Sequence, residues 1–183
     1  RDADLAALEQ RLGEAQPVAI GEIGLDFHDQ EADRARQLEL CAAQLAIARA
    51  AGLPVLLHVR KAHDEMLRLL RETPVVGGTA HAFNGSLQQA QQYRELGFCL
   101  GFGGMLTFER SSRLRRLASE LPLDAIVLET DAPDLTVASH RYERNSPAYL
   151  PEVLSALAEV RDADPAEVAR QTTANARRLL ALH

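Results

Sequence analysis

Four short apolar segments of the sequence end in side chains that can bind metal ions or move protons. These side chains are Glu22, His58, His81 and Asp131. A carboxylate or imidazole at the end of a buried strand loses hydration, and a partner or a cation must compensate for that loss. One such residue is typical of a satisfied core group. Four of them at successive segment ends indicate a shared site.

Two carboxylates and two imidazoles make a ligand set of mixed nitrogen and oxygen donors. Such a set suits Zn²⁺ or Mn²⁺, whereas a dedicated cage for Mg²⁺ or Ca²⁺ is built mostly from oxygen. A catalytic ion with an open position lowers the pKa of water towards about 7, and a nearby carboxylate can then accept the proton. The four residues therefore predict metal-assisted hydrolysis.

The elements that must position these residues alternate along the chain. Helical periodicity and capping residues predict helices over residues 5–12, 31–51, 62–71, 86–97, 110–120, 146–160 and from 164 onward. Short apolar runs predict strands over residues 18–23, 54–59, 75–81, 98–102 and 125–129. This alternation predicts parallel βαβ units, in either an open doubly wound sheet or part of a (β/α)8 barrel. Both architectures collect functional groups at the carboxyl ends of the strands.

Composition limits the class of protein. The 183 residues, 46% of them hydrophobic, predict one domain over residues 1–183 with a sizeable core. A net charge of −6 argues against sequence-blind nucleic-acid binding through surface charge, although not against a local site. No apolar run approaches the length that crosses a bilayer. Cys41 and Cys99 are too few and too far apart for a zinc knuckle or a disulfide framework, so we expect a cytoplasmic protein.

Five blocks of the sequence resemble, in order, those of the TatD family of metal-dependent hydrolases. The first is Gly21-Glu-Ile-Gly-Leu-Asp26, followed by Phe27-His28, which is similar to the GEIGLD signature of the family. The later blocks are Leu53–His58, Ala80–Ser86, Leu128–Pro133 and Arg144-Asn145, and the tail Thr172–Leu179 is also similar. The resemblance covers nearly the whole chain. It implies a TIM barrel of the amidohydrolase-like superfamily, two divalent metal ions (Zn, Mn or Mg) and, in several members, deoxyribonuclease activity on phosphodiester bonds.

The resemblance also implies a role for each metal-site residue. Glu22 would bridge the two ions, and His58 and His81 would bind the second ion. Asp131 would bind the first ion and act as the general base. Glu22 and Asp131 are thus the candidate catalytic residues.

The expected substrate is DNA or a nucleotide, with no membrane partner. Arg60 and Arg144 would bind the substrate phosphate, because a guanidinium pairs well with phosphate oxygens. His28 is a further candidate substrate contact, and Asp26 is expected to orient the loop of Glu22 or the substrate.

The sequence departs from the family at its amino end. It contains no His-x-His pair, which in relatives supplies two ligands to the first ion, and it also lacks the later His-Pro block. Matching the blocks in order makes the predicted strands the fourth to the eighth of the barrel. We therefore expect an incomplete, N-terminally truncated barrel whose second-metal set is intact and whose first-metal set retains only Glu22 and Asp131.

Other polar residues are interpreted without a catalytic role. Gly101–Gly104 is expected to be a strand end at which glycine lets the backbone approach the site. Solvent-facing side chains are expected for His63, His140, Arg113, Arg115 and Arg116.

Two alternatives to a phosphodiester hydrolase remain open at this point. The chain could be a catalytically inactive barrel fragment, because an open barrel leaves unpaired edge strands and a wet interior face. It could also be an amidohydrolase-like enzyme acting on amide or ester bonds of a non-nucleic substrate, because fold alone does not fix chemistry.

Overall fold

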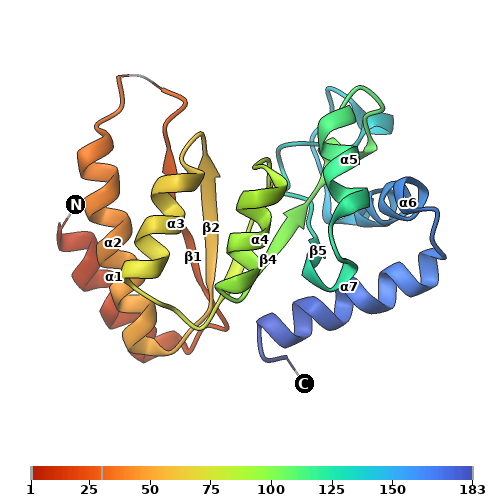
Figure 1. Cartoon of the computed structure of the whole chain (residues 1–183). Coiled ribbons are helices and arrows are strands. Elements are labelled where there is room, and N and C mark those ends of the chain that lie inside the picture. Colours follow the sequence, from red (N-terminus) through yellow and green to blue (C-terminus); the bar gives the residue numbers. More distant parts are fainter. Residues whose placement is uncertain (1, 30, 183) are drawn as a thin grey trace.

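The computed structural model describes residues 2–29 and 31–182 and has strands and helices in alternation (Figure 1). The strands are β1 (Ile20–Asp26), β2 (Val55–Arg60), β3 (Gly78–Ala80), β4 (Phe98–Phe102) and β5 (Ile126–Leu128). The α-helices are α1 (Asp2–Ala15), α2 (Arg34–Ala51), α3 (His63–Glu72), α4 (Leu87–Glu95), α5 (Ser112–Glu120), α6 (Leu150–Arg161) and α7 (Pro165–Leu179). The 3₁₀ turns are η1 (Gly104–Thr107), η2 (Leu123–Ala125), η3 (Ala138–His140) and η4 (Pro147–Tyr149).

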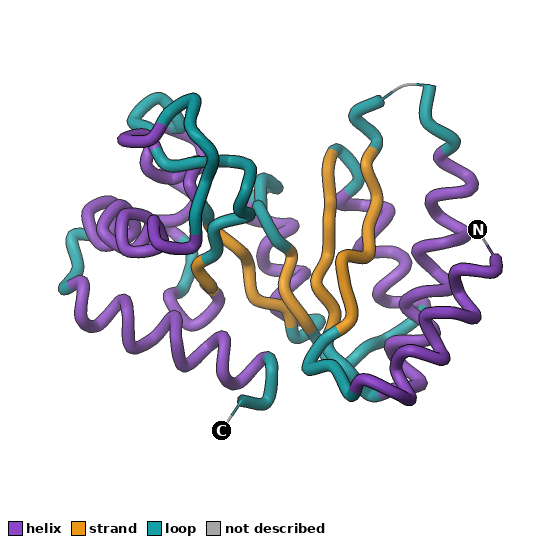
Figure 2. The backbone as a smooth tube through the Cα atoms, turned by 180° about the vertical axis from the view of Figure 1, so that it is seen from behind, coloured by secondary structure: helices purple, strands orange, loops and turns teal. Residues whose placement is uncertain are grey.

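The five strands form one parallel sheet in the order β1-β2-β3-β4-β5. A doubly wound sheet reverses its strand order at a switch point, whereas a barrel adds each strand beside the previous one. The sequential order therefore selects the barrel-type arrangement from the two architectures that the alternation predicted. Figure 2 shows the strands from the side that the helices do not cover.

Strand parity decides which side chains face the helices and which face the other side. In β2, Val55, Leu57 and Val59 are buried, whereas Leu56 and Arg60 are exposed and His58 is intermediate. In β1, the buried side chains of Ile23 and Leu25 alternate with Gly24 and Asp26. Because side chains alternate across a strand, the polar residues of both strands lie on the face away from the helices.

One hydrophobic core lies between the sheet and its helices, extending from Ile20 in β1 to Val168 in α7. Cys41 and Cys99 are free and buried. The strand predicted over residues 75–81 is shorter in the structure, where it begins at Gly78, because the chain before it turns at Gly77 with a positive φ of 121°. No helix in the described part of the chain is long and apolar enough to cross a bilayer.

Candidate metal centre

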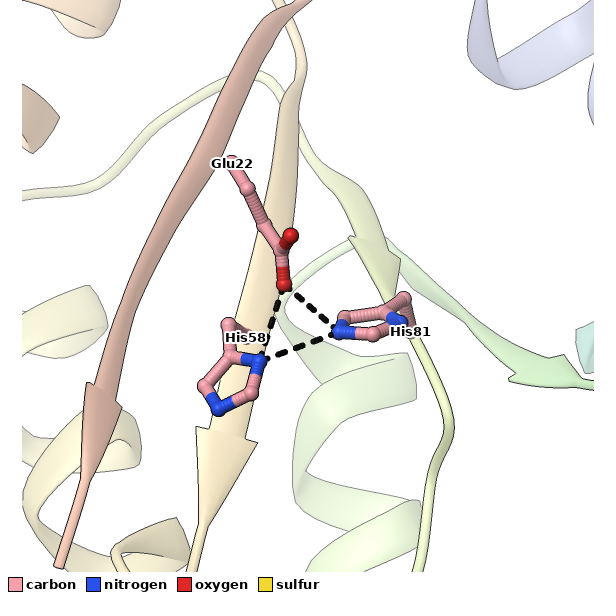
Figure 3. Close-up of side chains that lie close together, drawn as sticks. All are labelled: Glu22, His58 and His81. Atoms are coloured by element: carbon pink, nitrogen blue, oxygen red, sulfur yellow. Dashed lines mark hydrogen bonds and ion pairs between the residues drawn. The ribbon is translucent and has the colours of Figure 1, made fainter. Parts of the chain in front are cut away.

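Three of the four side chains predicted to form the site meet at one point. Glu22 Oε1 lies 2.9 Å from His58 Nδ1 and 2.6 Å from His81 Nε2. The two imidazole nitrogens are 3.2 Å apart. Figure 3 shows the three side chains converging from β1, from β2 and from the residue that follows β3. The three residues lie in or directly after neighbouring parallel strands, although Glu22 lies within β1 and His58 within β2 rather than at the strand ends that the sequence predicted.

The backbone of β1 explains how Glu22 reaches this point. The pairing of β1 with β2 shifts register between Ile20 and Ile23, and such an irregularity redirects the side chains within it. Beyond the shift, Gly24 pairs with His58, and a Cβ on Gly24 would lie 2.0 Å from the carbonyl oxygen of His58. Glycine at this position therefore lets the two strands run close enough for Glu22 and His58 to touch.

A second carboxylate lies behind each histidine. Asp26 Oδ2 is 3.4 Å from His58 Nε2, and Glu129 Oε1 is 3.8 Å from His81 Nδ1. Each histidine thus points one ring nitrogen at the centre, Nδ1 for His58 and Nε2 for His81, and the other ring nitrogen at a carboxylate. A carboxylate behind a ligating imidazole is a common way to fix its tautomer and orientation.

Glu129 is the site residue that the sequence analysis missed. Its Oε1 accepts a hydrogen bond of 2.6 Å from the main-chain N–H of Ala82, next to His81. A Cβ on Gly101 would lie 2.1 Å from Glu129 Oε2, so the glycine makes room for the carboxylate. The expected approach of the Gly101–Gly104 backbone to the site thus has a specific cause at Gly101. The sequence offered one signal, which was the second acid in Glu129-Thr-Asp131.

The carboxylates change the pKa values of neighbouring groups. The neighbouring carboxylate of Glu129 raises the pKa of His81 against the effect of burial, and the charges of Glu22 and Asp131 raise it further. Burial raises the pKa of Asp131, and Glu129 and Glu22 add repulsion, although the charge of His81 opposes both effects. For Asp26, burial opposes the net change, but hydrogen bonds from His28 N–H and His58 lower its pKa. The site therefore concentrates negative charge that a cation would neutralise.

Asp131 lines a cavity that His58 and His81 also line, but it is not part of the close group of Glu22, His58 and His81. It follows β5 in a loop that buried Asn145 holds in place. Asn145 Nδ2 donates to the carbonyl oxygens of Thr130 and Asp134, both at 2.6 Å. The loop thus fixes the Asp131 backbone near the edge of the metal centre.

The donor geometry suits a small divalent cation. Metal–ligand distances of about 2.0 Å place neighbouring ligand atoms about 3.3 Å apart in a tetrahedron. The three atoms are 2.6 to 3.2 Å apart, so movements of a few tenths of an ångström would admit an ion. Three donors also leave a coordination position open, as catalytic sites require.

A cavity of about 710 Å³ opens beside the metal centre. His58 and His81 line it together with the acids Glu129, Asp131 and Asp134. The guanidinium-bearing residues in its lining are Arg60, Arg110 and Arg113. The cavity therefore has both acidic and basic lining groups, and Arg113 is not the purely solvent-facing residue that the sequence predicted.

The three predicted substrate-binding residues, Arg60, Arg144 and His28, do not lie in one place. Arg60 lines the cavity, with Nη1 3.8 Å from Asp26 Oδ2. Arg144 lines a separate cavity of about 450 Å³ with Pro133 and Pro147. His28 is exposed, and its main-chain N–H donates to Asp26 Oδ1 at 2.8 Å.

Two further histidines differ from each other in exposure. His140 is partly exposed and stacks on Tyr149 with 4.0 Å between ring centroids. The prediction of a solvent-facing His63 is wrong, because His63 is buried, only 7% exposed, against Tyr93 and Phe83.

Known proteins are similar to this chain in sequence and in fold. A family model described as TatD related DNase matches residues 1–181. The uncharacterized metal-dependent hydrolase YabD of Bacillus subtilis is 35% identical over all of this chain and 72% of its own length. The 3′-5′ ssDNA/RNA exonuclease TatD of Cronobacter sakazakii is 40% identical over 97% of this chain and 70% of its own length. The crystal structure of YJJV, a TatD homologue from Escherichia coli K12, has a TM-score of 0.95 at 36% identity and covers 100% of this chain and 72% of that one.

These similarities bear on the interpretations left open by the sequence. They favour the metal-dependent hydrolase over an inactive fragment. The comparisons do not bear out the expectations of truncation and of an incomplete barrel. The chain belongs to the TatD family of metal-dependent hydrolases.

Proposed function

We propose that this chain is a divalent-metal-dependent nuclease that hydrolyses phosphodiester bonds of single-stranded nucleic acid. The observation that carries the proposal is the contact of Glu22 Oε1 with His58 Nδ1 and His81 Nε2 at the wall of an arginine-lined cavity. The name of the Cronobacter relative, an exonuclease for single-stranded DNA and RNA, supports the class of substrate. The continuous core from β1 to α7 supports residues 1–183 acting as one domain.

In this proposal Glu22, His58 and His81 bind a metal ion, and Asp26 and Glu129 hold the two imidazoles in the ligating tautomers. A bound divalent ion would lower the pKa of water in the site and polarise a phosphoryl oxygen. The nitrogen and oxygen donors suit Zn²⁺ or Mn²⁺. A second ion, bridged by Glu22 and bound by Asp131, remains a prediction of the family resemblance.

Asp131 is the proposed general base, because its carboxylate lines the cavity that also contains His58 and His81. The raised pKa of Asp131 brings it closer to the range in which a carboxylate exchanges protons efficiently. Arg60 lies in the same cavity and is the proposed partner of the phosphate charge. Arg144 and His28 are weaker candidates, since Arg144 lines another cavity and His28 lies outside those described above.

The test is a nuclease assay on metal-stripped protein. Purified chain is treated with EDTA, reloaded with Zn²⁺, Mn²⁺ or Mg²⁺, and incubated with end-labelled single-stranded and duplex DNA of the same sequence. We expect cleavage of the single strand only after reloading. Glu22→Gln and a His58→Ala, His81→Ala double variant should lower the rate at least a hundredfold, because each removes metal-binding groups that are worth on the order of several kcal/mol.

His140→Ala is the matched control, since His140 stacks on Tyr149 and does not line the cavity. It should cleave at the wild-type rate. Equal cleavage by the double variant, or an absence of bound divalent metal in the wild type by elemental analysis, would overturn the proposal. Hydrolysis of amide or non-nucleic ester substrates with no cleavage of DNA would replace it with the amidohydrolase-like alternative.

A further inference from the structure

The loop between β3 and α4 brings one uncharged polar side chain to the cavity. Asn84 follows His81 by three residues and lines the cavity together with Arg60 and Arg113. Neither the metal centre nor the proposed general base uses it. Its surroundings indicate which of its two polar atoms is available to a ligand.

A buried network lies behind Asn84. His63, in the first turn of α3, has Nδ1 at 3.2 Å from Tyr93 Oη and Nε2 at 3.1 Å from Asn84 Oδ1. His63 is 7% exposed and Tyr93 is completely buried. Burial lowers the pKa of His63 and raises that of Tyr93, so both groups are neutral near pH 7. The three residues thus form an uncharged chain of hydrogen bonds.

The direction of this chain follows from the buried phenol. Tyr93 has one hydroxyl hydrogen to donate, and in the described residues its hydrogen-bond contact is with His63 Nδ1. A buried donor without an acceptor is costly, so Tyr93 donates to Nδ1 and the proton of His63 is on Nε2. Nε2–H then donates to Asn84 Oδ1. This leaves the two N–H donors of Asn84 Nδ2 available to a ligand in the cavity that Asn84 lines.

The main chain of the same loop is held independently. Arg113 Nη2 donates to the carbonyl oxygens of Asn84 at 3.0 Å and Gly85 at 3.1 Å. At the other end of the loop, the N–H of Ala82 donates to Glu129. The amide of Asn84 is therefore oriented before any ligand arrives, which reduces the entropy lost on binding.

The neighbouring groups indicate the class of ligand. Arg60 and Arg113 bring positive charge, and an amide N–H pair adds neutral donors, a combination that suits phosphate oxygens. Met105 and Leu135 line the same cavity and are 38% and 42% exposed, so they offer an apolar surface to a nucleobase. Phosphate donors and an apolar surface in one cavity match a nucleotide unit.

We propose that Asn84 donates a hydrogen bond to a phosphate oxygen of the bound nucleic-acid strand, and that His63 and Tyr93 are positioning residues that keep its amide turned to the cavity. This inference rests on the proposed nuclease function. It adds a substrate contact outside the metal centre.

The first experiment measures binding without hydrolysis. A fluorescein-labelled thymidine pentanucleotide is titrated with protein in EDTA, and its dissociation constant is read from fluorescence anisotropy. We expect Asn84→Ala to weaken binding about tenfold, since loss of a hydrogen bond to a charged group costs on the order of 1.5 kcal/mol, and Asn84→Asp to weaken it more strongly, because the carboxylate adds repulsion. Asn84→Asp retains an acceptor for His63. If Asn84 had only a structural role, Asn84→Asp would therefore weaken binding less than Asn84→Ala.

The second experiment separates positioning from chemistry. His63→Leu and Tyr93→Phe should raise KM for the oligonucleotide about threefold with kcat unchanged. In His63→Gln, KM should return close to the wild-type value, because the glutamine amide can also donate to Asn84 Oδ1. Gln88→Ala, which removes an exposed amide on α4 outside the cavity lining, is the control and should match wild type.

The outcomes distinguish this inference from the proposed function. If wild type binds and cleaves the strand but Asn84→Asp binds as tightly, only the Asn84 contact is overturned. If wild type neither binds nor cleaves the strand, both proposals fail. Circular dichroism of each variant shows whether it is folded. If Asn84→Asp does not fold, the binding affinity of Asn84→Ala decides whether the Asn84 contact exists.

Discussion

His81 begins the loop that joins β3 to α4, His63 packs against the same loop, and the surroundings of the two histidines differ in charge. His81 touches Glu22 at 2.6 Å and has Glu129 behind it at 3.8 Å, which together raise its pKa. His63 is surrounded by a phenol, an amide and an aromatic ring, and burial lowers its pKa. One imidazole attracts a cation, whereas the other excludes a proton.

The difference shows that the neighbours of a histidine determine what it can do. Carboxylates around His81 favour a bound positive charge, whether a proton or a metal ion. The uncharged hydrogen-bond partners of His63 favour one fixed tautomer of its imidazole. That tautomer links Tyr93 to Asn84 and so orients the amide of Asn84. Chemistry is therefore expected from His81 and orientation from His63.

The largest contrast should appear in metal binding. His81→Ala removes one of the three donors of the centre and should lower the affinity for Zn²⁺ or Mn²⁺ on the order of 10²- to 10³-fold by isothermal titration calorimetry. His63→Gln should bind metal as wild type does, because His63 contacts none of the three ligating groups. Equal losses in both variants would remove the distinction between the two histidines.

A smaller effect is expected from the carboxylate behind His81. Glu129→Gln weakens the acceptor for His81 Nδ1, and Gly101→Ala would push a Cβ to 2.1 Å from Glu129 Oε2 in the unrelaxed structure. Both variants should reduce metal affinity by about 10- to 100-fold, the usual effect of disturbing the partner of a ligating histidine.

Gly13→Ala is the control for the glycine substitution, since an added Cβ at Gly13 meets nothing within 4 Å. It should leave metal affinity unchanged. Wild-type affinity in both Glu129→Gln and Gly101→Ala would show that Glu129 does not orient His81.

The smallest expected effect is a pH dependence of stability due to His63. In the unfolded chain an imidazole titrates near about pH 6.5. Because burial lowers the pKa of His63 in the folded protein, its stabilising contribution is complete above about pH 6.5 and is lost as the pH falls towards the folded-state value. Urea unfolding of wild type and His63→Gln at pH 7.5 and 5.5 in EDTA measures this loss.

Wild type should lose more stability than His63→Gln between these two pH values. The difference can reach about 1.4 kcal/mol for each pH unit within the window. An identical loss in the two proteins would contradict the neutral state assigned to His63.

The sequence predicted the parts of the fold and site that follow from local pattern and strand direction. Glu22 lies in β1, His58 in β2 and His81 directly after β3, so their meeting required that the predicted elements form one sheet with these strands side by side. The alternation of predicted strands and helices could not distinguish a barrel from a doubly wound sheet. Both have the same alternation of strand and helix and differ in strand order alone.

Residues whose role depends on distant partners were assigned incorrectly or missed. His63 looks like a polar residue at a helix start, and its burial comes from Tyr93 and Asn84, which belong to later segments. Arg113 looks like a surface charge of α5 until the β3–α4 loop packs beside it. Glu129 and Asp131 share strand parity, so alternation could not tell which acid reaches His81.

The space beside Gly101 has a consequence for how freely this position can vary. Every other amino acid has a Cβ, and a Cβ here would occupy the place of the Glu129 carboxylate. In a library of all single substitutions selected for metal-dependent activity, glycine should therefore be strongly enriched at position 101, although it contributes no chemical group to the reaction. Intolerance at such a position reports the volume that a neighbouring residue needs.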